Sequence, residues 1–192
     1  VSDLYMIMGD ILNKKGLEDE SFAAYDSCLQ WKDDNVAALN NYAYYISLKG
    51  KELHKAEQMS FKTIKAEPKN GTYLDTYAWI LFMEERYHEA KIYIDQAIAN
   101  LDSTQNNNTV IEHAGDIYAM NGLTEEALKF WKQSYDAGNK SEGIMTKIKN
   151  KRYITEEEIK RMTGGSAVTP DRKSQSRSGA KKNNKLRNGK KK

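Results

Sequence analysis

The sequence predicts an all-α protein built as a superhelix of paired antiparallel helices. Two observations lead to this fold. Small residues recur inside helical patterns in two series with a period of 34 to 37 residues, and only two prolines, Pro68 and Pro170, occur among 192 residues. The first series consists of Gly9, Ala43, Ala78 and Gly115, and the second consists of Ser21, Ala56, Ala90 and Ala127.

The two series run 12 or 13 residues apart, so each repeat unit carries one small residue on each of two helices. Antiparallel helices approach closely where they cross, and a small side chain at the crossing leaves room for the large apolar residues around it. A single helix pair cannot bury its apolar face alone, so the pairs are expected to stack.

The expected helices follow in order along the chain. First helices are predicted at about 2–15, 36–49, 71–84 and 108–121, and second helices at about 18–32, 52–67, 87–101 and 124–137. Glycines at positions 16, 50 and 122 mark the turns inside three of the pairs, whereas the third pair has Glu85 there. The polar loop 103–108 accounts for the longer third spacing.

Two further helices are expected after the fourth pair. Residues 141–151 place Ile144, Met145 and Ile148 on one side and lysines on the other, which is typical of a helix that caps a repeat array. Thr155 and Glu158 form a capping box that opens a short helix within 154–163.

The units resemble the tetratricopeptide repeat (TPR), with its pattern W-x2-L-G-x2-Y, then A-x3-F, then P. The first helices match it as Tyr5-x2-Met8-Gly9-x2-Leu12, Leu39-x2-Tyr42-Ala43-x2-Ile46, Leu74-x2-Tyr77-Ala78-x2-Leu81 and Ile111-x2-Ala114-Gly115-x2-Tyr118. The closing proline occurs once, as Pro68. The resemblance covers about residues 2–140 and implies a bacterial type of TPR solenoid. Its domain would span 1–153, with repeats at about 2–35, 36–70, 71–107 and 108–140 and a capping helix at 141–151.

Charge divides the chain into two parts. Residues 164–192 hold ten of the 30 basic residues and one of the 27 acidic residues, so their net charge is +9 and that of residues 1–163 is −6. The tail has few aliphatic residues, and we expect it to be disordered. It has two interpretations, as a tether to polyanions such as nucleic acid or an anionic envelope surface, or as a solubilising end.

No pattern for catalysis, a cofactor or a metal site is found. Cys28 is the only cysteine, the three histidines fall on different repeats, and nucleotide-binding and hydrolase motifs do not occur. No apolar run approaches the roughly 18–20 residues needed to span a bilayer. We therefore expect a binding protein and not an enzyme, either in the cytoplasm or in a bacterial envelope.

The resemblance implies that first helices line a concave surface that binds partners. The positions expected to be exposed there include Met6, Asp10, Asn13, Ser47, Thr76 and Met120. The expected partner-binding groove consists of Asn40, Asn41, Tyr44, Asp75, Trp79, Phe82, Glu112, His113 and Asp116. Chaperone-type TPR domains hold a peptide carboxylate with Lys, Arg and Asn, but this groove is acidic and aromatic. A basic or aromatic-seeking protein or peptide fits it better. The open alternative is that Tyr44, Trp79 and Phe82 pack against a neighbouring helix.

The expected function is that of a protein–protein interaction scaffold or adaptor. Two alternatives remain open, the polyanion tether and an interaction module of a larger enzyme or sensor. The helix at 2–15 has apolar residues on two sides, with Leu4, Ile7 and Ile11 forming one stripe. This width predicts a neighbour on each side, so we expect a preceding repeat in a longer chain.

Overall fold

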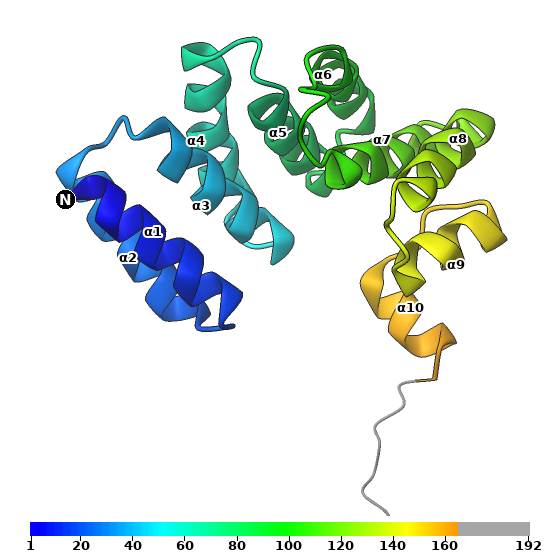
Figure 1. Ribbon diagram of the computed structural model, residues 1–192, viewed down its shortest axis with the longest axis horizontal. Helices are drawn as coiled ribbons and strands as arrows, with labels where there is room; N and C mark the ends of the chain where they lie inside the picture. Colours follow the sequence, from blue (N-terminus) through cyan, green and yellow to red (C-terminus); the bar gives the residue numbers. More distant parts are fainter. Residues whose placement is uncertain (165–192) are drawn as a thin grey trace, which may run out of the picture.

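The computed structural model describes residues 1–164, and this range contains ten helices and no strand (Figure 1). The first four pairs are α1 (Ser2–Lys14) with α2 (Glu18–Trp31), α3 (Val36–Leu48) with α4 (Leu53–Ala66), α5 (Gly71–Met83) with α6 (Tyr87–Ala99), and α7 (Asn108–Met120) with α8 (Thr124–Asp136). They are followed by α9 (Glu142–Asn150) and α10 (Glu156–Met162). Each bound lies within two residues of the bound expected from the sequence.

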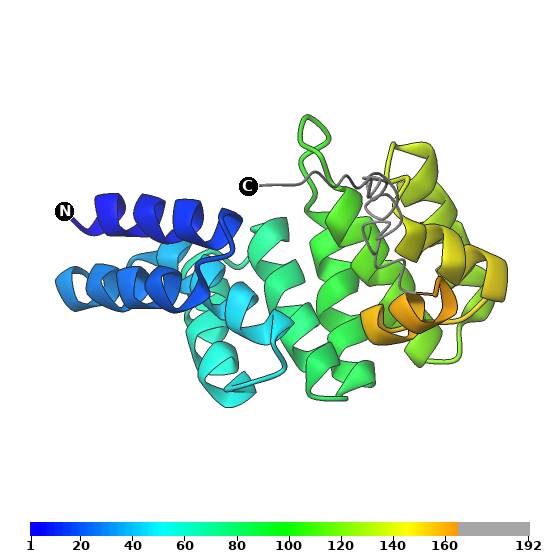
Figure 2. The same cartoon turned by 90° about the horizontal axis from the view of Figure 1, so that it is seen from below.

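The helix pairs stack in chain order into a curved array (Figures 1 and 2). Within each pair the two helices make extensive contact, and α4 packs on α5 as α6 packs on α7. The array bends so that α9 and α10 lie on its inner side, below α7 and α8 in Figure 1. The predicted all-α solenoid with a C-terminal capping helix is confirmed.

The small residues stand where helices cross, as predicted. A Cβ atom built on Gly115 would lie 2.3 Å from Cδ1 of Trp131, and one on Gly9 would lie 2.9 Å from the ring of Tyr25. Ala43 and Ala78 occupy the equivalent places in the inner pairs and are fully buried. Small residues therefore set how closely each pair can pack.

The turn inside each helix pair needs a left-handed backbone. Gly16, Gly50 and Gly122 have φ values of 75°, 62° and 78°, which glycine adopts without steric cost. Glu85 has a φ of 61° at the same place in the third pair. The third pair thus keeps the same left-handed turn without a glycine, and the backbone of Glu85 is strained as a result.

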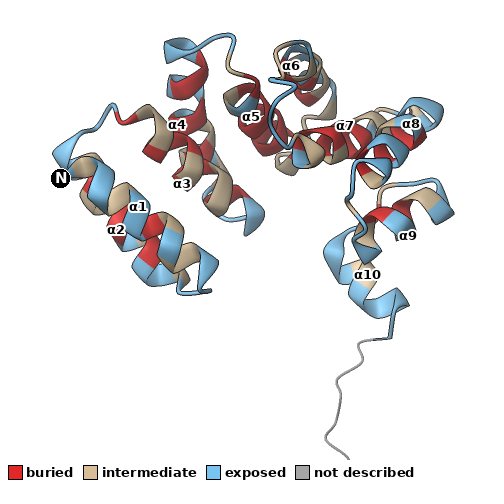
Figure 3. Ribbon diagram, in the orientation of Figure 1, coloured by how far each residue is buried: buried red, intermediate tan, exposed pale blue. Residues whose placement is uncertain are grey.

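The most deeply buried helix is α5, the third of the four first helices (Figure 3). This helix is buried on almost every side, from Leu74 through Phe82, because α4, α6, α3 and α7 all contact it. At the other extreme, Gly9 is the only buried residue of α1, and Leu4 is 70% exposed. The N-terminal stripe of Leu4, Ile7 and Ile11 faces solvent in this structure.

None of the described helices is both long enough and apolar enough to cross a membrane. The predicted tail at 164–192 lies outside the described residues except for Gly164, which follows α10 by two positions.

Candidate functional site

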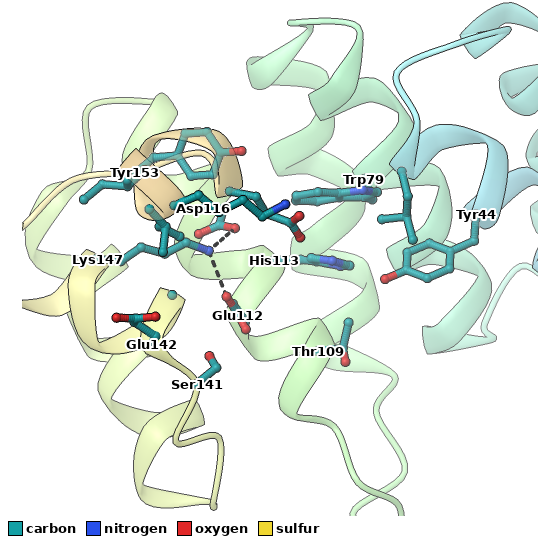
Figure 4. A pocket seen from close by; sticks show the side chains of 16 residues that line it. Tyr44, Trp79, Thr109, Glu112, His113, Asp116, Ser141, Glu142, Lys147 and Tyr153 are labelled. Carbon is teal, nitrogen blue, oxygen red and sulfur yellow. Dashed lines mark hydrogen bonds and ion pairs between the residues drawn. The ribbon is translucent and has the colours of Figure 1, made fainter. Parts of the chain in front are cut away.

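A cavity of about 510 Å³ opens on the concave side, where α3, α5 and α7 face the two C-terminal helices (Figure 4). Five of the nine predicted groove residues line it, namely Tyr44, Trp79, Glu112, His113 and Asp116. Its other walls come from Leu48, Thr109, Ser141, Glu142, Gly143, Lys147, Tyr153, Ile154, Glu156, Ile159 and Lys160. The cavity therefore joins three successive repeats to the end of the array.

Histidine and tryptophan rings form the floor of the cavity. Nδ1 of His113 lies 2.9 Å from Oδ1 of Asp75, and the imidazole stacks on Trp79 with centroids 4.0 Å apart. On its other side Trp79 stacks on Phe82 at 4.8 Å. Burial disfavours a charged imidazole, but the neighbouring Asp75 carboxylate outweighs it and raises the pKa of His113.

A lysine from the capping helix neutralises the acidic part of the floor. Nζ of Lys147 lies 2.8 Å from Oε1 of Glu112 and 2.7 Å from Oδ2 of Asp116, and Lys147 is only 5% exposed (Figure 4). The second oxygens are also occupied, because Trp131 donates to Asp116 and Asn139 donates to Glu112. These two carboxylates thus have a full set of partners inside the chain.

The environment shifts the pKa values of the three groups differently. At Asp116 burial dominates and raises the pKa, despite the ammonium beside it. At Glu112, which is less buried, burial is outweighed by the charge and hydrogen bond of Lys147 together with the hydrogen bond from Asn139, and the pKa is lowered. The pKa of Lys147 is raised because the two carboxylates outweigh its burial. The cluster therefore holds a charged lysine in a site shielded from water.

The expectation that the groove side chains are exposed is wrong for most of them. Trp79 is 8% exposed, and the following are also buried: Asn40, Ser47, Asp75, Thr76, Phe82, His113 and Asp116. Asp75 and Trp79 of α5 pack against His113 of α7, and residues of the C-terminal segment cover part of the same face. For Trp79 and Phe82 the structure favours the packing alternative, while Tyr44 is half-buried at the cavity wall.

Two predicted groove residues, Asn40 and Asn41, lie at the contact between the first two repeats instead. The Asn41 side chain donates a hydrogen bond to Oδ1 of Asp10 at 3.1 Å, and the same oxygen accepts a hydrogen bond from the hydroxyl of Tyr25. Asn40 is buried beside it, and its Oδ1 has no hydrogen-bond partner. Neither asparagine lines the cavity, so the structure separates them from the five groove residues that do.

Sequence reasoning missed the part of the wall that comes from residues 141–160. It placed all the lysines of the capping helix on the outer side, but Lys147 points inward beside Ile144, which is fully buried. Tyr153 reaches back to Phe82, with ring centroids 5.2 Å apart, and Ile154 is almost fully buried. The only local signal was the spacing of Ile144 and Lys147, three residues apart on one helix face.

Within the described residues, no group of His, Cys, Asp and Glu side chains has the arrangement of a metal site.

No protein-family model matches the sequence, and no curated protein matches it significantly. Solved structures do match its shape. PilF of Pseudomonas aeruginosa is 16% identical over 78% of this chain and 67% of its own, with a TM-score of 0.67. A thermophilic TPR protein of Thermus thermophilus, TTC0263, is 10% identical over 79% of this chain and 81% of its own, with a TM-score of 0.63. YrrB, a TPR protein with an unusual peptide-binding site, is 18% identical over 77% of this chain and 74% of its own, with a TM-score of 0.55. The chain has the fold of the tetratricopeptide-repeat proteins.

Proposed function

We propose that this protein is an interaction scaffold, without catalytic activity, whose concave cavity receives a segment of a partner protein. The observation that carries the proposal is the cavity itself, which combines aromatic rings, apolar side chains and a few charged groups from three repeats and the C-terminal helices. Such a mixture is typical of sites that bind ligands. The peptide-binding site of YrrB, on the same fold, supports the choice of a peptide as ligand.

The walls of the cavity limit what can bind. Lys147 and Tyr153 close the side next to α7, so a long peptide cannot run along the whole concave face. We infer that a short segment enters, a chain end or a loop, and places a few side chains in the cavity. The acids lining it outnumber the lysines by four to two, which favours a basic segment.

An array of immobilised random dodecapeptides tests this proposal when a labelled protein is passed over it. We expect a subset of peptides to bind, and we expect Thr109→Trp to abolish their binding, because Thr109 is an exposed residue at the cavity wall. Thr72→Trp is the matched control, since Thr72 holds the same position in the preceding repeat and does not line the cavity.

Equal loss of binding in both variants would show that peptides bind elsewhere or that tryptophan disturbs the array generally. Unchanged binding by Thr109→Trp would exclude the cavity as the binding site. Circular dichroism of both variants confirms that their helices are intact.

A further inference from the structure

We propose that the cavity binds an amide carbonyl oxygen of the partner segment through hydrogen-bond donors on three rings, those of Tyr44, Trp79 and His113. The inference rests on the proposed function, because it names the chemical group that the cavity recognises in the bound segment. It gives a use to polar ring atoms that have no partner within the described residues.

The three rings lie together on the side of the cavity formed by α3, α5 and α7. The centroid of the His113 ring is 4.0 Å from that of Trp79 and 6.2 Å from that of Tyr44. Figure 4 shows these rings grouped at one side of the cavity, whereas Lys147 and Tyr153 stand at the other. A single small group of a ligand can therefore meet all three rings.

Each ring carries a polar atom without a hydrogen-bond partner among the described residues. Nε1 of Trp79 is buried and has no partner. The Tyr44 hydroxyl makes no hydrogen bond, and His113 uses only Nδ1, in its contact with Asp75. By contrast, Nε1 of the buried Trp131 donates to a carboxylate at 2.9 Å. A buried N–H without an acceptor is rare, because it has lost water and gained no replacement.

The group that binds these rings must be an acceptor, since the rings offer donors. An indole N–H can only donate, and a tyrosine hydroxyl can donate as well as accept. The Asp75 carboxylate raises the pKa of His113, and a protonated imidazole donates from both of its nitrogens. An oxygen atom of the ligand would satisfy these donors, including the one that burial has left unpaired.

Charge favours a neutral oxygen over a carboxylate. The cavity lining includes four acids and three cationic groups, Lys147, Lys160 and His113, and the carboxylate of Asp75 pairs with His113. Five carboxylates thus face three cations, so an anion would enter a site that is already negative. An amide carbonyl is the neutral oxygen acceptor that every protein segment carries.

The first test uses two small probes with the same skeleton. N-acetylglycine methylamide has amide carbonyls only, whereas N-acetylglycine ends in a carboxylate. The chain has three tryptophans, so a ¹⁵N spectrum shows few indole signals, and Trp79→Phe identifies that of Trp79. The signal of the exposed Trp31 reports unspecific effects.

At pH 6.5 we expect the methylamide to shift the Trp79 signal at about fivefold lower concentration than N-acetylglycine requires. No shift by the methylamide, or a shift at lower concentration by N-acetylglycine, would overturn the inference. A shift of Trp31 as large as that of Trp79 would overturn it too.

The second test removes one donor and keeps its ring. Tyr44→Phe should weaken the dodecapeptides that bind on the array about fivefold, the effect of one neutral hydrogen bond. Tyr45→Phe is the matched control and should change binding less than twofold, because this neighbouring tyrosine is also half-buried and does not line the cavity. Equal effects of the two substitutions would contradict the inference.

The sequences of the bound dodecapeptides show which carbonyl is held. A main-chain carbonyl predicts that Tyr44→Phe weakens all of them alike, and a side-chain amide predicts a loss confined to peptides with Asn or Gln. Both results support an amide carbonyl as the ligand group. A loss confined to peptides with Asp or Glu would show that a carboxylate is bound, and the inference would be wrong.

The inference and the proposed function fail separately. If Thr109→Trp blocks the dodecapeptides but the methylamide does not shift the Trp79 signal, the inference falls and the proposed function stands. If the methylamide shifts that signal but Thr109→Trp leaves dodecapeptide binding unchanged, the proposed function falls and the carbonyl site remains.

Discussion

Trp131 lies against Gly115 with no space for a side chain between α7 and α8. We predict that Gly115→Leu lowers the free energy of unfolding by about 1–3 kcal/mol, because the added atoms overpack this crossing. Urea denaturation measures the change. Lys132→Leu, at an exposed position next to Trp131, should cost less than about 0.5 kcal/mol. A Gly115→Leu protein as stable as the parent would place the crossing elsewhere.

Trp79 is a second residue whose role depends on packing. Its indole is stacked between Phe82 and His113, so removing it opens a space inside the array. We predict that Trp79→Ala destabilises the protein by about 3 kcal/mol. Calorimetric melting is the measurement. An unchanged melting temperature, together with lost peptide binding, would show instead that Trp79 acts as a free platform for ligands.

His113 should make stability depend on pH. Its pKa is raised in the folded protein by Asp75, in spite of burial. The stabilisation from the charged imidazole is therefore complete below the unfolded pKa of about 6.5 and is lost as the pH rises through the folded value. We predict that His113→Gln removes this loss between neutral and alkaline pH, as measured by urea unfolding at several pH values. His88→Gln, at an exposed position, should retain it.

At the scale of the element, α9 is joined to the concave face by a single buried lysine. Lys147→Met should destabilise the protein by about 3 kcal/mol or more, because it leaves Glu112 and Asp116 buried without a cation. Lys149→Met on the exposed side of the same helix is the control and should change stability little.

The electrostatic origin of that loss can be checked in the same protein. Adding Glu112→Gln and Asp116→Asn to Lys147→Met should recover much of the stability, since the buried charges are then removed together. If the triple variant is no more stable than Lys147→Met alone, the lysine acts through its packing and not through its charge. Chemical denaturation at neutral pH of the parent, Lys147→Met, Lys149→Met and the triple variant distinguishes the charge effect from the packing effect.

At the scale of the whole molecule, stability should be uneven along the array. Helix α1 buries only Gly9 and has its stripe of Leu4, Ile7 and Ile11 in solvent, whereas α5 is covered by neighbours on all sides. We predict that the amides of Ser2–Lys14 exchange with solvent faster than those of Gly71–Met83. Hydrogen exchange followed by mass spectrometry is the measurement. Equal protection of both helices in a monomer would contradict this uneven distribution.

The repeat pattern by itself determined the helices, their pairing and their order. A period near 34 with small residues at fixed places is a local signal, because each crossing involves helices that are neighbours in the chain. Even Glu85 follows its repeat, adopting the left-handed turn that glycine has elsewhere. Five of the residues predicted for the groove line the cavity, since the first helices of such an array share one face.

Only the tertiary structure decided which of the predicted groove residues are exposed to solvent and which are buried. Trp79 and Phe82 are buried because His113 of α7 stacks on Trp79 and Tyr153 packs against Phe82, and these contacts join residues far apart in the chain. The pairing of Lys147 with Glu112 and Asp116 joins residues 35 and 31 positions apart, and no periodicity encodes it. The C-terminal helices lie beyond the last repeat, so their place is set by long-range packing and charge, and residues 141–160 supply much of the cavity wall.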